Sequence, residues 1–570
     1  IMLDEDAVVT AAGGRFEGMD RYEARAAVKA ARKAEHHLAG VEEHAHSVGH
    51  CYRCKTVIEP YLSDQWFVKV GPLVEPAVEV VRDGEMRFVP GRWANNYFRW
   101  MENLRDWTIS RQIWWGHRIP AWTCAACDEV IVALDDPTRC GCGSTELSQD
   151  PDVLDTWFSS ALWPFSTLGW PEETPDLERY YPNSVMVTGY DIIYFWVARM
   201  IKMGIHFMGE IPYPDVVIHG LIRAEDGRKM SKSLGNAADP LDLVAEHGAD
   251  ALRLALIQSA SPGQDVPFRA DSVDAARRFG NKLWNGIRFA LPHLGEVPAE
   301  GGYPEDPSPE NRWVLSRLHV VLTEFDSMLD DYRFSDAYGL LYSFTWSEVF
   351  DWYLELAKTP LRGGDPAETA ATLGVVLRDL LKAFHPVIPY LTEELWTEVV
   401  GDGLLAGGTW PDPPAYDEPE GFEIFRELVV GIRRFRAEHG LAPRHPLDVT
   451  LVDPAGIAGE WWGPQFEALA SVAPQPAAAA PEGEGFTRVV AGGAEAFISM
   501  EGLVDVEAER ARLTKALEET DTLLAGSEKK LSNQQFLERA PEAVVAKERA
   551  KAAELADRVV RLQAQLDDLG

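Results

Sequence analysis

The sequence lacks long apolar runs and an apolar leader segment. No stretch approaches the roughly 20 uncharged apolar residues that a membrane span needs, and the most hydrophobic segment, Ile192 to Met208, is interrupted by Arg199 and Lys202. The first residues are acidic and do not form a basic region followed by an apolar one. We therefore expect no membrane span, no signal peptide and a cytoplasmic location. Because residue 1 is Ile, we expect the natural start to lie upstream.

Cysteine and basic residues are also scarce. The six cysteines in 570 residues are too few for a disulfide scaffold, and they occur in close pairs, which is typical of metal ligands. The 54 basic residues stand against 90 acidic ones, for a net charge of −36. This charge repels phosphate in general, so a nucleic-acid partner requires local basic clusters and a marked salt dependence of binding.

The chain is too long for one core, and its patterns change along its length. Residues 1–60 look like the end of a domain. In 61–275, strand-like runs at Ser184–Thr188 and Val216–Ile218 alternate with helical ones, which predicts a parallel sheet covered by helices. The prolines between Trp66 and Phe98 indicate short strands and turns there. Residues 276–440 predict a helical bundle, and 441–500 a small α+β element.

The last segment, 501–570, has the pattern of a coiled coil. Apolar residues recur at alternating spacings of three and four from Ala552 to Leu569, and leucines give a second seam from Leu513 to Leu531. Pro541 suits the first turn of the second helix. We therefore predict an antiparallel coiled-coil hairpin, with a dimerising coiled coil as the alternative.

A loop rich in hydrogen-bond donors follows a strand that ends at His219-Gly220. Between Gly227 and Gly235 it carries Lys229, Met230, Ser231, Lys232 and Ser233, and a helix begins after Asp239. Phosphoryl chemistry needs positive charge aimed at phosphate oxygens, and flanking glycines permit loop closure. The sequence therefore predicts a phosphate-binding loop; the alternative is a solvated Lys/Ser loop.

Four residues are candidates for a ligand pocket at the carboxyl edge of the sheet, where open parallel sheets bind nucleotides: Asp155, Trp157, Gly189 and Asp191. Trp157 could form the wall of an apolar slot, and Asp155 or Asp191 could accept hydrogen bonds from an ammonium group or a ribose. Alternatively, Trp157 belongs to the core and Asp191 is a helix N-cap.

Cys124, Cys127, Cys140 and Cys142 lie in a small insertion at 121–150 and predict a structural zinc site. The Cys140-x-Cys142 spacing is shorter than usual, and reduced buried thiols are the alternative. Cys51 and Cys54 lie near His44, His46 and His50 and could bind a second metal or supply ligands to the first, but we favour reduced, buried thiols.

Two basic groups are candidates for phosphate contacts. Arg433, Arg434, Arg436 and Arg444 cluster near the end of the helical region, whereas Lys529, Lys530 and Arg539 lie in the terminal hairpin, where 11 basic residues face 15 acidic ones. Ordinary solvated charges are the alternative.

The Lys229–Ser233 loop resembles the signature loop of class I aminoacyl-tRNA synthetases. Ile109–Pro120, Asp152–Leu162 and Thr188–Trp196 resemble segments of the valyl members. His385–Trp396 is similar to the anticodon-binding bundle, and 530–545 to the valyl C-terminal arm, which isoleucyl and leucyl relatives lack.

This resemblance implies a multidomain α/β protein that acts as a monomer on ATP with Mg²⁺, L-valine and tRNA(Val). It contains the second half of a Rossmann-like sheet with a zinc-knuckle insertion, an all-α anticodon-binding bundle, a small α+β element and the coiled-coil arm, which is expected to touch the outer corner of the tRNA. Lys232, with Lys229 assisting, is expected to hold the ATP phosphates. His219, Gly220, Met230, Ser231 and Ser233 are the other expected ATP-binding residues.

One part of the family pattern has no counterpart in this sequence. We find no His-x-Gly-His motif, and only Asp4–Arg25 is similar to the editing domain, so we expect the 570-residue chain alone to activate valine poorly. The alternatives are a non-catalytic tRNA-binding remnant and a zinc-knuckle scaffold with a coiled coil.

Overall fold

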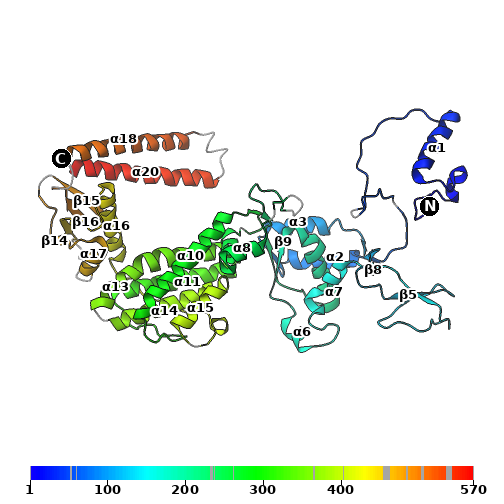
Figure 1. Ribbon diagram of the computed structural model, residues 1–570, viewed down its shortest axis with the longest axis horizontal. Coiled ribbons are helices and arrows are strands. Elements are labelled where there is room, and N and C mark those ends of the chain that lie inside the picture. Colours follow the sequence, from blue (N-terminus) through cyan, green and yellow to red (C-terminus); the bar gives the residue numbers. More distant parts are fainter. Residues whose placement is uncertain are drawn as a thin grey trace. The chain divides into compact units, whose positions relative to one another are not determined.

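The computed structural model describes residues 2–51, 54–59, 61–230, 235–236, 238–260, 262–363, 366–401, 403–453, 462–482, 485–501, 506–533 and 542–568. The chain forms two compact units, Ile1–Ile218 and His219–Gly570, and each is described by itself (Figure 1). Within the described ranges, no helix is both long enough and apolar enough to cross a bilayer.

The first unit is built around a small sheet with helices packed on it. The sheet order is β2-β10-β9, with strands Arg87–Val89, Asp215–His219 and Val185–Gly189, and β2 and β10 are parallel. Helices α2 (Gly71–Arg82), α3 (Arg92–Met101) and α7 (Ala198–Met208) contribute to one core with Phe88 and Val216. The parallel pairing and the strand positions predicted from the sequence are confirmed.

The remaining elements of this unit are short except for the 14-residue helix α1. They are η1 (Ala11–Phe16), α1 (Arg21–Ala34), β1 (Phe67–Val68), β3 (Trp107–Thr108), β4 (Ser110–Arg111), β5 (Ala121–Cys124), β6 (Val130–Val132), β7 (Leu147–Gln149), β8 (Val153–Leu154), α4 (Thr156–Ser160), α5 (Trp163–Ser166), α6 (Pro175–Tyr180), η2 (Tyr190–Ile192) and η3 (Ile193–Val197).

The prediction of only short strands and turns between Trp66 and Phe98 was wrong. Most of this segment is in α2 and α3, although β1 and β2 are strands. Pro72 lies in the first turn of α2, where its missing N–H group removes no helical hydrogen bond, and Pro76 is accommodated within the helix. Burial of Ala77, Val78 and Val81 on one face of α2 outweighs the proline signal.

The second unit is mainly helical. Its helices are α8 (Pro240–His247), α9 (Ala249–Ser259), α10 (Ala270–Ala290), α11 (Pro309–Asp330), α12 (Phe334–Ser343), the π-helix η6 (Phe344–Tyr353), α13 (Leu354–Gly363), α14 (Pro366–Phe384), α15 (Pro389–Val399), α16 (Phe422–Glu438) and α17 (Gly463–Ala470), with 3-10 turns η5 (Leu291–His293) and η7 (Leu405–Gly407).

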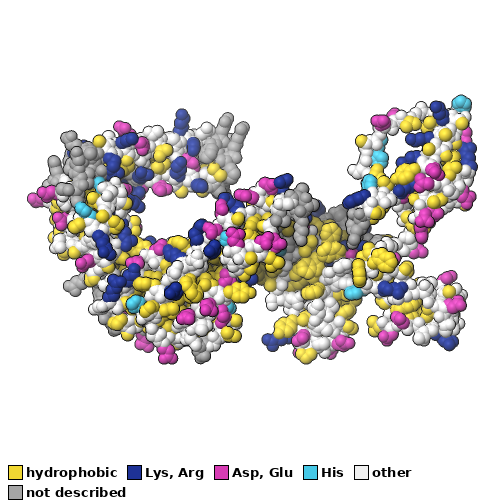
Figure 2. All heavy atoms as spheres, in the orientation of Figure 1, with side chains coloured by type: hydrophobic (Ala, Val, Ile, Leu, Met, Phe, Trp, Pro, Cys, Tyr) yellow, Lys and Arg dark blue, Asp and Glu magenta, His cyan; other side chains and the backbone are white. Residues whose placement is uncertain are grey.

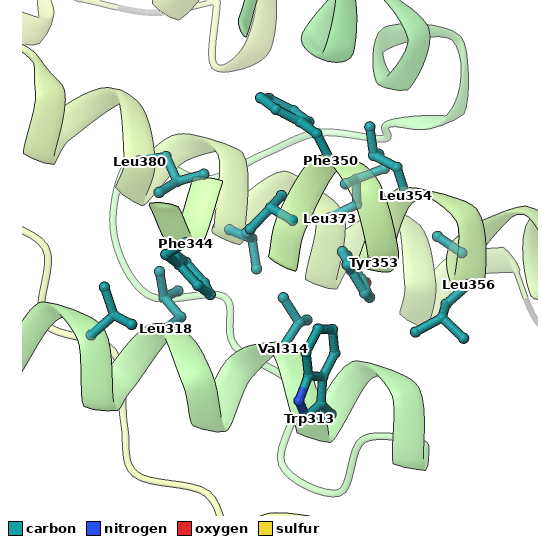
Figure 3. Close-up of a cluster of buried hydrophobic side chains, with 14 of the residues drawn as sticks. Trp313, Val314, Leu318, Phe344, Phe350, Tyr353, Leu354, Leu356, Leu373 and Leu380 are labelled. Atoms are coloured by element: carbon teal, nitrogen blue, oxygen red, sulfur yellow. The ribbon is translucent and has the colours of Figure 1, made fainter. Parts of the chain in front are cut away.

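Helix α14 lies at the centre of the bundle, because nearly all its residues from Thr369 to Phe384 are buried. Side chains from α11, η6, α13 and α14 converge between these helices, among them Trp313, Phe344 and Leu373 (Figure 3). The predicted helical region is therefore confirmed.

Two small sheets and a helix pair complete this unit. Strands β11 (Ile222–Arg223) and β12 (Val266–Pro267) pair in parallel, and a four-stranded sheet has the order β14-β13-β16-β15, with strands Gln475–Ala477, Val449–Val452, Ala494–Ser499 and Phe486–Ala491. Helices α18 (Val506–Leu531) and α20 (Glu542–Asp568) pack along each other (Figure 1).

The facing positions of the terminal helix pair keep the alternating spacing of three and four. On α18 they include Leu513, Leu517 and Leu524, but also the buried hydroxyl side chains of Thr520 and Ser527. On α20, Leu555 is buried and Leu562 and Leu566 pack against the main core. The seam is thus more polar on α18 than the leucine pattern alone indicates.

Candidate functional site

Asp155 is the centre of a buried polar cluster in the first unit. It lies at the N-cap of α4, where its carboxylate accepts a hydrogen bond from the amide of Trp157 (3.2 Å). One carboxylate oxygen also accepts from Arg111 (2.7 Å) and from the indole N–H of Trp107 (3.1 Å). Asp155 is only 5% exposed, and its carboxylate oxygens already accept hydrogen bonds from these donors. The geometry therefore favours a role for Asp155 in positioning its neighbours over direct contact with a ligand.

Asp191 is placed differently. It follows β9 in the short 3-10 turn η2, and its side chain is exposed and makes no helix-capping hydrogen bond. The N-cap alternative is therefore wrong, since Gly189 holds that position. A free carboxylate at the carboxyl end of a sheet strand is available to a ligand's donors.

Trp157 is half-buried and stacks on Phe195 at 6.0 Å between ring centroids. Phe195 is 45% exposed, so this aromatic pair faces solvent rather than closing the core. Gly189, which ends β9, is buried. Asp155, Trp157, Gly189 and Asp191 all belong to the first unit, and their ligand contacts stay predictions.

The predicted phosphate-binding loop begins as a tight hairpin in the second unit. Arg223 and Lys229 form an isolated bridge, and the turn between them is closed by the amide of Gly227, which has a positive φ of 79° and donates to Ala224 (2.8 Å). Lys229 is exposed, and its ammonium group has no ion partner in the part of the chain that the structure describes. Ser231, Lys232 and Ser233 lie outside the described residues.

The base of this hairpin is fixed by residues that the sequence analysis did not single out. Asp265 accepts hydrogen bonds from the amide of Leu221 (2.9 Å) and from Arg223 (2.6 Å). A Cβ on Gly220 would overlap the backbone carbonyl of Gln264, so only glycine fits there. His219 is exposed, and its ring Nδ1 lies 2.8 Å from the carbonyl of Gly220. The role of Asp265 becomes evident only from the pairing of β11 with β12, which brings this residue beside Leu221 and Arg223.

The four cysteines of the insertion converge on one point. Their sulfur atoms all lie within 4.8 Å of one another, with Cys124–Cys142 at 3.7 Å and Cys127–Cys140 at 3.6 Å. Tetrahedral zinc with sulfur at about 2.3 Å separates its ligands by about 3.8 Å, so these four residues fit such an ion.

Backbone hydrogen bonds explain why the two cysteine pairs, which have different spacings in the sequence, still bring their sulfur atoms together. In the first turn, the amide of Asp128, at φ 58°, donates to Cys124 (2.9 Å). In the turn that is one residue shorter, the amide of Gly143, at φ 94°, donates to Cys140 (2.9 Å). Hydrogen bonds from backbone amides, that of Ala126 first, lower the pKa of Cys124 to about 6, whereas the carboxylate of Glu129, burial and the neighbouring thiols raise the pKa of Cys140. The convergence of the four sulfur atoms, and not these pKa values, therefore supports a metal site.

The Cys51–Cys54 turn repeats the geometry of the Cys124–Cys127 turn. The amide of Lys55, at φ 62°, donates to Cys51 (2.9 Å), and the amide of Cys51 donates to Thr56 (2.8 Å). Both thiols are free. Among the residues described, no third Cys, His, Asp or Glu joins them. Cys54 is exposed and Cys51 only partly buried, so the expectation of buried thiols was wrong, whereas their reduced state stays a prediction.

The arginines at the end of the helical region have different surroundings. Arg436 is 3% exposed and donates to the backbone carbonyls of His445, Ala470 and Ser471, so its burial argues against the predicted phosphate contact. Arg433 donates to Leu469 (2.8 Å). Arg434 is exposed and, with Arg426 and Arg488, lines a groove of about 720 Å³ beside α16.

The basic residues of the terminal helix pair are exposed. Lys530 lies 3.5 Å from Glu548 across the pair, whereas Lys529 has no ion partner within the described part. Arg539 lies outside the described residues. In Figure 2, acidic and basic side chains are interspersed over the visible surface, so the cations form local groups and not one broad patch.

Family models match three successive parts of the chain. Residues 17–269 match "tRNA synthetases class I (I, L, M and V)", 311–451 match "Anticodon-binding domain of tRNA ligase", and 505–570 match "Valyl tRNA synthetase tRNA binding arm". The class I catalytic region and the helical anticodon-binding region predicted from the sequence are thus confirmed.

Several similar curated proteins are valine–tRNA ligases. The Geobacter sulfurreducens enzyme is 46% identical over 599 residues, covering 100% of this chain and 66% of that protein. The Syntrophotalea carbinolica and Streptomyces avermitilis enzymes are each 44% identical and are covered to 65% and 64%, with 100% and 99% of this chain aligned.

A solved structure of Mycobacterium tuberculosis methionyl-tRNA synthetase with methionyl-adenylate aligns with 65% of this chain and 71% of its own, at 19% identity and a TM-score of 0.48.

The chain spans about two thirds of the length of the curated relatives. From its family matches and these relatives, the chain belongs to the valyl-tRNA synthetase family of class I aminoacyl-tRNA synthetases.

Proposed function

We propose that the protein is a valine–tRNA ligase. In the first step a carboxylate oxygen of valine attacks the α-phosphorus of ATP, the bond to the β-phosphate breaks, and valyl-adenylate and pyrophosphate form. In the second step a hydroxyl group at the 3′ end of tRNA(Val) attacks the valyl carbonyl carbon, and AMP leaves. The observation that carries this proposal is similarity to valine–tRNA ligases over the whole chain, including the terminal arm.

The residues of the Lys229 hairpin supply positive charge for the first step. Lys229 is exposed on a hairpin that Asp265 fixes at its base, so its ammonium group is free to meet phosphate oxygens as charge develops on them. We propose the same role for Lys232. ATP is expected to enter with Mg²⁺, which neutralises charge on the phosphates themselves.

Two carboxylates in the first unit have separate roles in this proposal. Asp191 is exposed and has no hydrogen-bond or ion-pair partner among the residues that the structure describes, which suits an acceptor for the ammonium group of valine or for a ribose hydroxyl. Asp155 positions Trp157 and Arg111 around the pocket. Trp157 and Phe195 offer an apolar wall for a branched side chain.

We propose that tRNA is held by local cations in the second unit. The exposed residues Arg434, Lys529 and Lys530 are the candidates, and helices α18 and α20 act as a coiled-coil arm. In a chain of net charge −36, these contacts should be strongly salt-dependent. Nothing in this arrangement requires a second copy of the chain, and we propose a monomer.

The ligase proposal is tested with the natural full-length protein by valine-dependent ATP–pyrophosphate exchange. Replacing Lys229 by Ala should lower the exchange rate about 10- to 100-fold, because one charged hydrogen bond to phosphate is lost. Lys29→Ala, an exposed lysine of α1, is the matched control and should leave the rate unchanged. Exchange with another amino acid but not with valine would refute the proposal.

We also propose that Cys124, Cys127, Cys140 and Cys142 hold one structural zinc ion. Its four thiolate bonds would tie together an insertion with few buried apolar residues of its own. Metal analysis of the purified chain should give one zinc ion, lost on replacing Cys127 by Ser and kept on replacing Cys54 by Ser. A zinc content that is equal in both variants would contradict this assignment.

A further inference from the structure

The first unit contains a pocket of about 300 Å³ whose charged lining residues are mostly cationic. It lies between the end of α3, strand β3 and helix α7, and its charged lining residues are Arg105, Asp106, Arg111, Arg199 and Lys202. We call it the Arg199–Lys202 pocket. Four cations against one carboxylate are unusual in a chain with 90 acidic residues.

Lys202 is the most isolated of these cations. Only 3% of the residue is exposed, and its ammonium group has no hydrogen bond or ion pair within the described part of the chain; its neighbour is the ring of Trp100, at 5.3 Å. Burial, with a smaller effect of Arg199, lowers the pKa of Lys202 to about 8. The lysine is therefore still mainly protonated at neutral pH.

Arg199 lies one helical turn before Lys202 on the same side of α7. It is 8% exposed, its guanidinium group stacks on Trp107 at 3.7 Å, and its Nη1 atom makes no hydrogen bond to any described residue. The carboxylate of Asp155 is 3.8 Å away, an ion pair that is too long for a hydrogen bond. Arg199 therefore has unused donor capacity.

The other charges around the pocket do not balance these two. Arg111 spends its donors on Asp155 and on the carbonyls of Thr108 and Ser110. Asp106 is exposed and accepts from the amide of Val70 (3.2 Å). Buried cations that are not fully paired are costly. Lys202 has no ion pair among the described residues and Arg199 has only the long one with Asp155, so the two together indicate that an anion completes the site.

We propose that the Arg199–Lys202 pocket binds a phosphate group. Lys202 supplies a point charge with three donors, Arg199 supplies free N–H groups fixed by stacking on Trp107, and Arg105 lies exposed at the pocket wall. The phosphate comes either from a free phosphate compound or from an RNA strand. This inference extends beyond the ligase chemistry proposed above, because Arg105, Arg199 and Lys202 are not among the residues assigned to ATP or valine, although Arg111 lies near both sites.

The test is calorimetric titration of the 570-residue chain with inorganic phosphate at constant ionic strength, without ATP, valine or tRNA, so that its outcome is independent of the ligase assay. One phosphate should bind per chain. Lys202→Met and Arg199→Met should each weaken binding about tenfold or more, whereas Lys202→Arg keeps the charge and should keep binding. Lys29→Met, which removes an exposed lysine, should leave binding unchanged.

Two further measurements complete the test. Thermal unfolding without phosphate should show Lys202→Met to be at least as stable as the wild type, which separates lost binding from lost folding. If a single-stranded RNA oligonucleotide displaces phosphate, RNA is the source; if it does not, a free phosphate compound is, and both results support the pocket. No binding by the wild type, or equal binding by Lys202→Met and Lys29→Met, would overturn the proposal.

Discussion

Arg378 in the helical unit and Arg199 in the sheet-containing unit are both withdrawn from water, at 1% and 8% exposure, but they differ in their partners. Arg378 donates to Asp379 (2.8 Å) and to the carbonyls of Pro298 and Gly301, and Asp379 also accepts from the hydroxyl of Tyr303 (2.6 Å). Arg199 has no equivalent set. Two arginines that are both buried therefore have two roles: Arg378 completes a network that holds helices together, whereas Arg199 has unused donors and faces a cavity.

The largest effect is expected where the network is complete. Arg378→Met leaves the fully buried carboxylate of Asp379 without its cation, which should lower the free energy of unfolding by about 3–5 kcal/mol. Urea unfolding followed by circular dichroism measures this loss. Arg333→Met removes an exposed ion pair with Asp336 and should cost at most about 1 kcal/mol. An equal loss of unfolding free energy in Arg378→Met and Arg333→Met would show that the buried network is no more important for stability than an exposed ion pair.

Lys202 should behave in the opposite way. Its folded pKa of about 8 lies below its usual 10.5, so the unfolded chain binds more protons between these values, and wild-type stability should rise with pH there. Lys202→Met removes this slope and should be more stable at pH 7 by at most about 3 kcal/mol.

Unfolding of wild type and Lys202→Met at pH 7 to 9, without phosphate, measures this difference. The measurements stop at pH 9 because burial lowers the pKa of Arg199 to about 10, so Arg199 would begin to lose its proton at higher pH. The other charges facing the pocket, Arg105, Asp106 and Arg111, are common to both proteins. A parallel pH dependence in the two proteins would show that Lys202 is already paired.

Asp155 tests what holds Arg199 and Arg111 in place. Asp155→Asn keeps the side-chain shape but removes the charge that two arginines face, so we expect a loss of about 2 kcal/mol in unfolding free energy. Asp191→Asn should change stability by less than about 0.5 kcal/mol, because that carboxylate is exposed and uncapped. A larger loss for Asp191→Asn would reverse the two assignments.

The smallest effect on stability is expected for Glu548, whose charged side chain is partly exposed. A hydrogen bond from Ser527, followed by the charge of Lys530, lowers the pKa of Glu548 below its usual 4.5. This carboxylate should therefore stabilise the helix pair above pH 4.5, and the contribution is lost as pH falls through the lowered pKa. Glu548→Gln should lower the melting temperature slightly at pH 7 and not at pH 3; the same difference at both values would contradict this account.

Much of the fold follows from local patterns. The alternation of strands and helices in the first unit and the apolar spacing along α11, α14 and α16 are visible in the sequence, which is why the parallel sheet and the helical region at 276–440 were predicted. Helix α2 was missed because two prolines outweigh its apolar face when only local signals are read. Tertiary packing decides that case.

The candidate site was only partly predictable. Motifs pointed to Lys229, Asp155 and the four cysteines. Exposure and hydrogen bonding depend on distant segments, and these properties distinguish Asp191 from Asp155 and Arg434 from Arg436. Arg199 and Lys202 first stood out only as interruptions of an apolar segment. Two cations three residues apart in such a helix are themselves a signal of a buried charged site.

The hydroxyl side chains of Thr520 and Ser527 occupy seam positions seven residues apart on α18. Thr520 donates to the carbonyl of Ala516 in its own helix and adds no hydrogen bond across the pair, whereas Ser527 hydrogen-bonds Glu548 of α20. Cohesion between the helices is therefore weakest at Thr520 and strongest near the base, where Leu513, Leu562 and Leu566 join the main core. The arm should accordingly flex at the level of Thr520 while its root stays rigid, and thereby adjust to the curvature of a bound surface without losing either helix.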